Sequence, residues 1–212
     1  MMGKDKKVIL RELVKLHQPD CYIEIGAHRL KTTLMLAALM PVEASLLAID
    51  LYELAPREEL PPEEPPIGLA EAEAIMAGAG QARKRVLKAN SRDLTPSDLP
   101  ELHAARRPFV FIDGGHSAET SIADFRLITG SIHPEATAIV VVDDADMEGT
   151  VAARGEALAW AKGKGGVSFI AAYMLVLSQN PVQVSDPTQV PDPAEVPAES
   201  PVPSPSVSSS DP

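Results

Sequence analysis

Apolar positions follow two different spacings along the first 180 residues, and each spacing predicts a different kind of element. Apolar residues three and four positions apart predict an amphipathic helix, as between Asp5 and Gln18, which Pro19 ends. Short continuous apolar runs between glycine, proline and polar residues predict buried strands. We expect helices over 5–18, 31–40, 69–77, 95–105, 117–132 and 149–162, and strands over 21–26, 45–51, 85–90, 108–113, 137–142, 167–171 and 174–178.

The order of these elements indicates an α/β fold. The first five strands alternate with helices, and most of them are continuous apolar runs, which is typical of a parallel sheet covered on both sides. Only Ala172 and Tyr173 separate the last two strands, and a parallel crossover needs many more residues, so these two strands must be antiparallel. The sequence therefore predicts a Rossmann-like three-layer sandwich, with a mostly parallel seven-stranded sheet and an antiparallel last strand.

Two stretches differ from this pattern in composition. Residues 180–212 contain nine prolines, seven serines and five acidic residues without a basic residue, which predicts a disordered, Pro/Ser-rich acidic tail. Residues 54–66 contain five prolines and four acidic residues, which excludes an interior helix or a central strand. We interpret this stretch as a surface loop, with an active-site lid as the alternative. The predicted domains are thus a folded unit over 1–179 and a tail over 180–212.

Charge and composition exclude several classes of protein. The chain has 19 basic and 30 acidic side chains, a net charge of −11, which argues against nucleic acid as a partner. A single cysteine rules out a disulfide scaffold. The N-terminal residues lack the apolar stretch of a signal peptide, and no apolar run reaches 18 residues, so we expect a cytoplasmic location and no membrane partner. A homo-oligomer is left open.

Carboxylates stand at the ends of the predicted strands, where ligands bind in open α/β sheets. Glu24 and Gly26 end the first strand, and Asp50 ends the second, where an acid can accept both hydroxyls of a ribose. A structural role for Asp50 as a turn cap is the alternative. The turn after the first strand is not GxGxxG, which makes pyrophosphate binding and a nicotinamide-dependent dehydrogenase improbable.

Three carboxylates at the ends of the fourth and fifth strands form the sharpest feature. Asp113, Asp143 and Asp144 would meet at one edge of the sheet if these strands are neighbours, and a hard divalent cation such as Mg²⁺ would relieve their repulsion. Because adjacent strand residues point to opposite faces, Asp143 and Asp144 can share a ligand only if the chain bends after Val142. His116 lies beside them and is a candidate proton acceptor, or a residue of a helix N-terminus.

Four stretches together carry a resemblance to a known family: EIGAHRLKTTLMLA, LLAIDLYE, PFVFIDGGHSAETSIADF and AIVVVDDAD. They resemble class I S-adenosylmethionine-dependent methyltransferases, and among these the small bacterial metal-dependent O-methyltransferases of the macrocin and cephalosporin-hydroxylase-like group. The resemblance spans residues 19–179. It implies a seven-stranded sheet whose seventh strand is antiparallel, and transfer of a methyl group to the hydroxyl of a small molecule, such as a sugar or a secondary metabolite.

The resemblance also assigns roles to residues. Glu24 and Gly26 would border the methionine part of S-adenosylmethionine, Asp50 would bind the ribose, and Asn90 and Ser91 would lie near the adenine. The implied cofactor-binding residues are Glu24, Gly26, His28, Asp50, Asn90, Ser91 and Asp113; the implied metal ligands are Asp113, Asp143 and Asp144; the implied catalytic residues are His116 and Asp113.

Two departures from the family pattern matter. Leu30, Lys31 and Thr32 stand where relatives usually have small residues, and their bulk would narrow the methionine pocket. Gly115 stands where some relatives carry an aspartate proposed as the base, so His116 takes over, the metal alone acidifies the hydroxyl, or activity is lost. The alternative to an enzyme is therefore a catalytically inactive protein that keeps the methyltransferase fold as a binding or scaffold protein.

Overall fold

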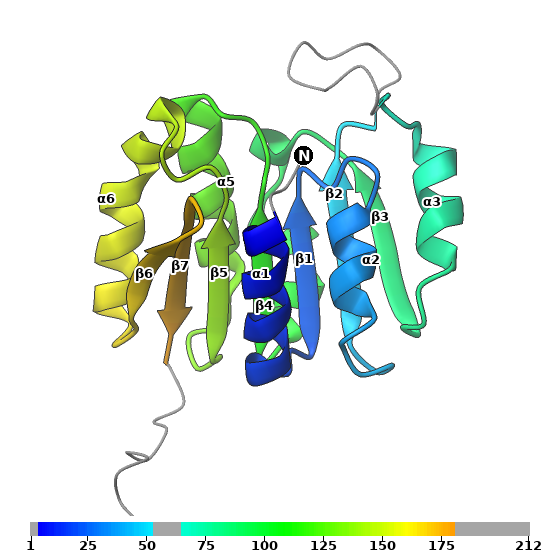
Figure 1. The fold of residues 1–212 in the computed structure, drawn as a ribbon, viewed down its shortest axis with the longest axis horizontal. Helices are drawn as coiled ribbons and strands as arrows, with labels where there is room; N and C mark the ends of the chain where they lie inside the picture. Colours follow the sequence, from blue (N-terminus) through cyan, green and yellow to red (C-terminus); the bar gives the residue numbers. More distant parts are fainter. Residues whose placement is uncertain (1–3, 53–64, 181–212) are drawn as a thin grey trace, which may run out of the picture. The chain divides into compact units, whose positions relative to one another are not determined.

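A sheet of seven strands organises the protein, whose computed structural model describes residues 4–52 and 65–180 (Figure 1). The strand order is β3-β2-β1-β4-β5-β7-β6. The strands are β1 (Cys21–Ile25), β2 (Ser45–Asp50), β3 (Arg83–Lys88), β4 (Pro108–Ile112), β5 (Ala138–Val142), β6 (Ser168–Ala171) and β7 (Met174–Gln179). The helices are α1 (Lys4–His17), α2 (Lys31–Ala37), α3 (Leu69–Ala77), α4 (Pro100–Ala104), α5 (Ala118–Ser131) and α6 (Glu148–Gly163).

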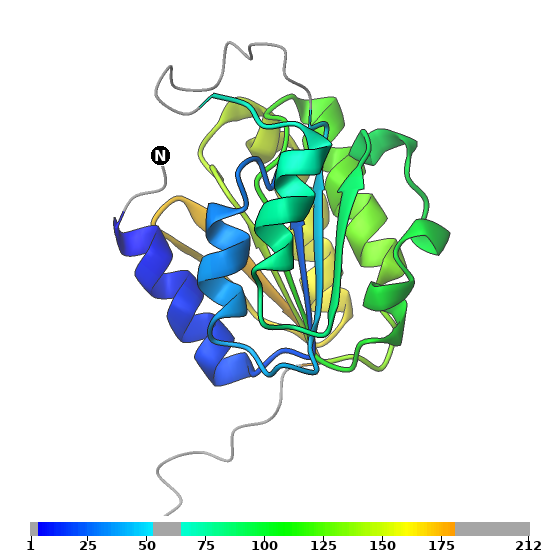
Figure 2. The same ribbon diagram turned by 90° about the vertical axis from the view of Figure 1, so that its right-hand side faces the viewer.

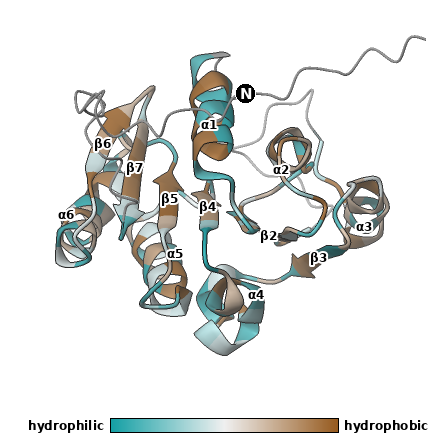
Figure 3. Ribbon diagram, turned by 90° about the horizontal axis from the view of Figure 1, so that it is seen from below, coloured by the Kyte–Doolittle hydropathy of each residue, from teal (hydrophilic) through white to brown (hydrophobic). Residues whose placement is uncertain are grey.

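The sheet confirms the predicted fold class. Strands β1 to β5 pair in parallel, and β7 runs antiparallel to both β5 and β6. Helices α1, α2 and α3 cover one face of the sheet, and α4, α5 and α6 cover the other (Figures 2 and 3). Each face has its own apolar core, the first around Leu10, Tyr22 and Phe111 and the second around Ile23, Phe125 and Leu177. This is the three-layer sandwich that the sequence predicts.

Several predicted boundaries were wrong. Helix α2 ends at Ala37, three residues before the predicted end, and two further differences have a clear cause. The helix expected over 95–105 is shorter, because Pro96 and Pro100 each start a new turn; the segment forms a 3₁₀ turn over Pro96–Asp98, and α4 begins at Pro100. A further 3₁₀ turn covers Ser91–Asp93. Strand β3 begins two residues before the predicted position, because pairing with β2 sets its bounds: Arg83 lies opposite Ser45 and Lys88 opposite Asp50. Arg83 and Lys84 are charged, so an apolar run does not include them in the predicted strand.

The register of the parallel strands places their carboxyl ends at the same level. Ile25 lies opposite both Ile49 and Ile112, and Ile112 lies opposite Val142. The ladder continues one residue further, since the backbone N–H of Asp113 donates to Ile25 and that of Asp143 donates to Ile112. Residues just after these strands therefore become neighbours at one edge of the sheet.

Some predictions lie outside the described residues. The predicted tail begins at Asn180, the last described residue, so its disorder stays a prediction, and most of the proline-rich stretch over 54–66 is likewise not described. Among the described helices, none is both long and apolar enough to span a bilayer.

Candidate active site

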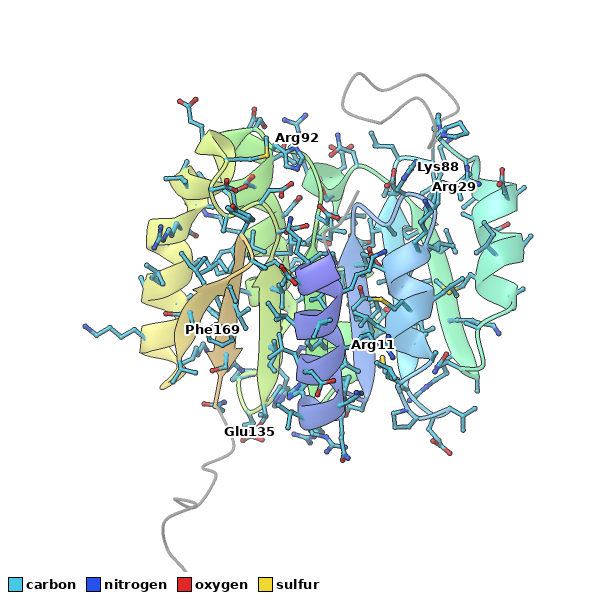
Figure 4. The ribbon with its side chains drawn as sticks, viewed as in Figure 1. Arg11, Arg29, Lys88, Arg92, Glu135 and Phe169 are labelled. Atoms are coloured by element: carbon cyan, nitrogen blue, oxygen red, sulfur yellow. The ribbon has the colours of Figure 1, made fainter. Side chains whose placement is uncertain are left out.

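A cleft of about 940 Å³ opens at the carboxyl ends of the parallel strands. This is the edge near which Arg29, Lys88 and Arg92 lie in Figure 4. A volume of this size suits a ligand as large as a nucleoside with an amino-acid side arm. All seven predicted cofactor-binding residues line it, together with His116 and Asp144; of the predicted site residues only Asp143 is not among the lining residues. The topology thus brings together side chains that are far apart in the sequence.

The turn after β1 has an unusual backbone. Gly26, His28 and Leu30 all have positive φ, at 83°, 42° and 61°. Such values are costly for residues other than glycine, so the turn stores strain at two of these positions. The glycine is required at position 26, because a Cβ there would lie 1.9 Å from the carbonyl oxygen of Asp113. The turn after β1 therefore packs directly against the backbone of the loop after β4.

Leu30 does not narrow the cleft as its bulk suggests. Its side chain is fully buried and packs into the core beneath α2, and it is not among the described residues that line the cleft. Lys31 and Thr32 do line it. Of the three residues of the first departure, Leu30 therefore takes no space in the cleft, whereas Lys31 and Thr32 border it.

Glu24 lies beneath this turn as a buried carboxyl group. Its side chain is 2 % exposed and accepts hydrogen bonds from the hydroxyls of Tyr22 and Thr33, at 2.9 and 2.5 Å. Burial raises the pKa of Glu24 to about 7, with a smaller contribution from Asp50, while the two hydroxyls oppose the rise. The group is thus held rigidly, and a bound cation would favour its charged form.

Asp50 is also buried and fixed by the backbone. Its carboxylate accepts hydrogen bonds from the N–H of His28, at 2.8 Å, and from the N–H of Tyr52, at 3.3 Å. These contacts hold Asp50 at the end of β2, where it lines the cleft. In the turn after β3, the Asn90 side chain accepts a hydrogen bond from the N–H of Arg92 at 3.1 Å and so orders the turn that carries Ser91.

An acidic cluster with one histidine closes the end of the cleft formed by β4 and β5. One ligand atom each from Asp113, His116 and Asp144 lies within 4.8 Å of the others. Asp144 reaches this position because its φ of 45° bends the chain directly after Asp143. Helix α6 packs closely against the backbone of His116, since a Cβ on Gly149 would lie 1.8 Å from the carbonyl oxygen of His116.

The carboxyl groups of this cluster raise one another's pKa, and the Lys6 ammonium compensates their charge only in part. Burial, together with the neighbouring carboxylates of Asp143, Glu24 and Asp144, raises the pKa of Asp113 to about 8. The Nε2 atom of His116 is buried without a hydrogen bond among the described residues, although it lies 3.3 Å from a carboxylate oxygen of Asp144. Two carboxylates and an imidazole with a buried nitrogen are a donor set that fits a divalent metal ion.

Asp143 faces another group. Its carboxylate is 2.6 Å from the ammonium of Lys6 in α1, and it also accepts the N–H of Asp144 at 2.8 Å. The same ammonium lies 2.8 Å from Asp144. Burial lowers the pKa of Lys6, but its contacts with the two aspartates outweigh burial, and the pKa lies above its ordinary value. The bend at Asp144 thus brings its carboxylate beside Asp113 and His116, while Lys6 contacts both Asp143 and Asp144.

Sequence reasoning missed two charged residues near the site. Lys6 gives no local signal, because its partners Asp143 and Asp144 lie near the other end of the folded unit. Asp124 could have been found from the sequence, because it lies between Ser121 and Phe125 on the buried face of α5. Its side chain is 0 % exposed, and one of its oxygens would lie 2.7 Å from a Cβ on Gly114.

Asp124 supports a prediction of pH-dependent stability. Its oxygens make no well-formed hydrogen bond among the described residues, and burial raises its pKa to about 6, with Ser91 and Arg92 opposing the rise. An unfolded aspartate ionises near pH 3.8, so this group makes the fold less stable as the pH rises from about 4 to 6. Asp124→Asn should therefore be more stable than wild type at pH 7.5, by up to about 3 kcal/mol, and similar to it near pH 4.

Urea unfolding at pH 4.5 and 7.5 measures this difference. The matched control is Asp93→Asn, which changes an exposed carboxylate of the neighbouring 3₁₀ turn and should alter stability little at either pH. Equal stability of Asp124→Asn and wild type at pH 7.5 would contradict the prediction.

Comparison with known proteins agrees with the fold. Residues 23–145, more than half of the chain, match a sequence family described as a methyltransferase domain. The sheet order, the antiparallel β7 and this match together define a class I S-adenosylmethionine-dependent methyltransferase. The chain belongs to this methyltransferase domain family. No curated protein sequence matches it.

Solved structures share the fold at low sequence identity. CalS11, a calicheamicin methyltransferase, superposes with a TM-score of 0.57 at 13 % identity, over 82 % of this chain and 77 % of that chain. A methyltransferase from Geobacter sulfurreducens superposes with a TM-score of 0.53 at 10 % identity, over 84 % of this chain and 80 % of that chain. At these identities the likeness concerns the fold alone.

Proposed function

We propose that this protein transfers a methyl group from S-adenosylmethionine to a hydroxyl oxygen of a small molecule, assisted by a divalent metal ion such as Mg²⁺. The observation that carries the proposal is a cleft that contains both sets of residues. The cofactor-binding residues line one part of it, and Asp113, His116 and Asp144 line the adjoining part. Methyl transfer needs this arrangement, since donor and acceptor must be aligned within one enclosed space.

The cofactor part of the cleft has a role for each predicted residue. Gly26 lets the backbone approach a bound molecule closely, and Glu24 beneath it provides negative charge for the positively charged methionine end. Asp50 is held by two backbone N–H groups, with its remaining acceptor capacity suited to ribose hydroxyls. Asn90 and Ser91 border the opposite end of the cleft, where the adenine would lie.

The acidic part of the cleft supplies the chemistry at the acceptor oxygen. S-adenosylmethionine supplies a methyl group on a positively charged sulfur, and a divalent ion lowers the pKa of a hydroxyl near it. Asp113 and Asp144 would hold the ion. His116, in the same group, would stay unbound and accept the proton of the hydroxyl, because Gly115 has no side chain that can serve. Thr120 crowds Gly115, since its Cγ2 would lie 3.1 Å from a Cβ there.

The proposed substrate class is a hydroxylated small molecule, either a sugar or a secondary metabolite. One structural relative of this chain, in its apo form, is CalS11 described as a TDP-rhamnose 3′-O-methyltransferase, which indicates a sugar acceptor for that protein. Together with the resemblance of the motifs to macrocin-type enzymes, this supports a sugar as the first acceptor class to test. The cytoplasmic location and the lack of a nucleic-acid partner stay predictions.

The alternative of a catalytically inactive binding or scaffold protein rests on the bulk of Leu30 and Lys31 and on the Pro/Ser-rich tail. Because Leu30 packs into the core and the cleft keeps about 940 Å³, the bulk of Leu30 does not support this alternative. The tail lies outside the described residues. The deciding experiment offers S-adenosylmethionine, Mg²⁺ and a panel of sugars and hydroxylated metabolites to the full chain, and measures release of S-adenosylhomocysteine. We expect acceptor-dependent release that chelation of the metal reduces. Cofactor binding without turnover on any acceptor would support the scaffold instead.

His116→Gln separates chemistry from binding. It removes the proton acceptor but keeps a polar side chain of similar length, so we expect kcat to fall by about 10²- to 10⁴-fold. The affinity for S-adenosylhomocysteine should change little. The matched control is His103→Gln in α4, outside the cleft, which should leave kcat unchanged. Steady-state kinetics and calorimetric titration test both parts, and an unchanged kcat of His116→Gln would refute this role of the histidine.

A further inference from the structure

Lys6 occupies a position that a cation would otherwise take at the acidic end of the cleft. Its ammonium lies 2.6 Å from Asp143 and 2.8 Å from Asp144, and its side chain is only 13 % exposed. The residue belongs to the first turn of α1, which is drawn in dark blue and has its N-terminal end near the carboxyl ends of the strands (Figure 1). The N-terminal helix is thus tied to the loop after β5 through one largely buried charge.

The two carboxylate oxygens of Asp144 contact two different side chains, Lys6 and His116. Its Oδ1 contacts Lys6, and its Oδ2 lies 3.3 Å from His116, within the group of ligand atoms that could hold a metal. A divalent ion bound to this group would stand close to the ammonium. Two cations that close repel strongly at a site shielded from water, where charges are weakly screened.

We propose that Lys6 and the divalent ion are alternative partners of Asp144, and that metal binding therefore displaces the Lys6 ammonium and releases the first turn of α1 from the site. This inference rests on the proposed metal-assisted function. It assigns Lys6 the role of a positioning residue, which neutralises the cluster while the metal is absent and sets the metal affinity. It also links occupancy of the site to the packing of the N-terminal helix.

The test compares Mn²⁺ binding by titration calorimetry in the full chain and three variants. Lys6→Gln removes the competing charge and should bind Mn²⁺ at least tenfold more tightly than wild type. Lys6→Arg keeps the charge and should stay close to wild type. Lys7→Gln is the matched control, because Lys7 is exposed, lines the same cleft and makes no ion pair among the described residues. An equal gain in Lys7→Gln and Lys6→Gln, or no gain in Lys6→Gln, overturns the proposal.

Hydrogen exchange provides a second readout that does not depend on affinity. Mn²⁺ should speed exchange of the amides at the start of α1 in wild type and leave it nearly unchanged in Lys6→Gln, where the helix is already released. Slower exchange in wild type on adding Mn²⁺ overturns the proposal. Titration with S-adenosylhomocysteine, run in parallel, separates the two claims: retained cofactor binding with no Mn²⁺ binding in any variant refutes the competition and leaves the methyltransferase assignment standing.

The outer strand β6 supports a second, independent inference. Four side chains in and beside it are apolar or aromatic and exposed: Val167 and Tyr173 above 60 %, and Phe169 and Ile170 at 46 % each. Phe169 and Ile170 are adjacent, so both faces of the strand are uncovered. Phe169 lies at this edge of the sheet in Figure 4. Strand β6 pairs with β7 on one side, and its other side has no strand among the described residues.

The opposite edge of the same sheet is protected in the usual way. Strand β3 exposes Arg83, Lys84 and Lys88, and such charges keep an edge strand from pairing with another chain. Residues 165–173 contain no charged side chain and no proline. Helix α6 lies beside β6 in Figures 1 and 3, and it carries the exposed apolar residues Val151 and Leu158.

We infer that β6 pairs antiparallel with β6 of a second copy of this chain and forms a two-fold symmetric dimer with a continuous sheet. Light scattering after size exclusion should give the mass of a dimer for the full chain. Phe169→Lys and, separately, Ile170→Pro should give a monomer, while Val42→Lys, which changes an exposed apolar residue elsewhere, should remain a dimer. A monomeric wild type, or a dimer that persists in both edge variants, overturns the inference.

Discussion

Asp113→Asn should reduce methyl transfer by at least about 10³-fold while the protein stays folded. Asp113 stands at the end of β4 and contributes to both parts of the cleft: it lines the cofactor region, and its carboxyl group belongs to the cluster with His116 and Asp144. Asparagine keeps the size of the side chain but removes the negative charge that a divalent ion needs. We therefore expect Mn²⁺ affinity to fall steeply and S-adenosylhomocysteine affinity to fall far less.

Stability distinguishes this loss from simple unfolding. Burial and neighbouring carboxylates raise the pKa of Asp113 to about 8, so its charged form is unfavourable in the folded chain. Removing the charge should leave the melting temperature at pH 8.5 equal to or above that of wild type. Asp146→Asn, an exposed change in the same loop as Asp144, serves as the control and should keep full activity. An Asp113→Asn variant that retains turnover would contradict the assigned role.

Gly26→Ala should have the largest effect on both the fold and cofactor binding. The backbone at Gly26 has a φ of 83°, and an added Cβ would lie 1.9 Å from the carbonyl oxygen of Asp113 and 2.8 Å from the nitrogen of Gly114. The contacts are with backbone, so no side chain can move aside. The loops after β1 and β4 must separate, which we expect to cost about 3 kcal/mol or more and to weaken S-adenosylhomocysteine binding at least about 100-fold.

The control for this substitution is Gly155→Ala. Gly155 lies in the middle of α6 with nothing within 4 Å of an added Cβ, so alanine should stabilise the protein by about 0.5–1 kcal/mol. Urea unfolding and calorimetric titration measure both variants. A Gly26→Ala protein with wild-type stability and affinity would contradict the close packing of the loops after β1 and β4.

The sequence predicted the strands and their ends because both signals are local. Apolar runs marked the strands, and the rule that ligands bind at the carboxyl ends of parallel strands selected Glu24, Asp50 and Asp113, all of which line the cleft. The parallel register then placed these residues at one level. A fold of this kind can be predicted from spacing alone, since each βα unit repeats the same geometry.

The grouping of the charged residues could not be predicted in the same way. Which of Asp143 and Asp144 faces His116 depends on a backbone bend of one residue, and the partner of Asp143 comes from a helix at the other end of the sequence. Leu30 shows a similar limit: its bulk suggested a narrowed pocket, but a left-handed backbone turns the side chain into the core. Local sequence patterns predict neither the bend at Asp144 nor the direction of the Leu30 side chain.

Calorimetric titration of the full chain with S-adenosylmethionine and with S-adenosylhomocysteine, each with and without Mg²⁺, tests the central claim most directly. The geometry of the cleft predicts micromolar binding of both, because hydrogen bonds within the protein hold Glu24, Gly26 and Asp50 in place. No binding of either compound to the folded protein would contradict the account, and would mean that this cleft serves a different ligand.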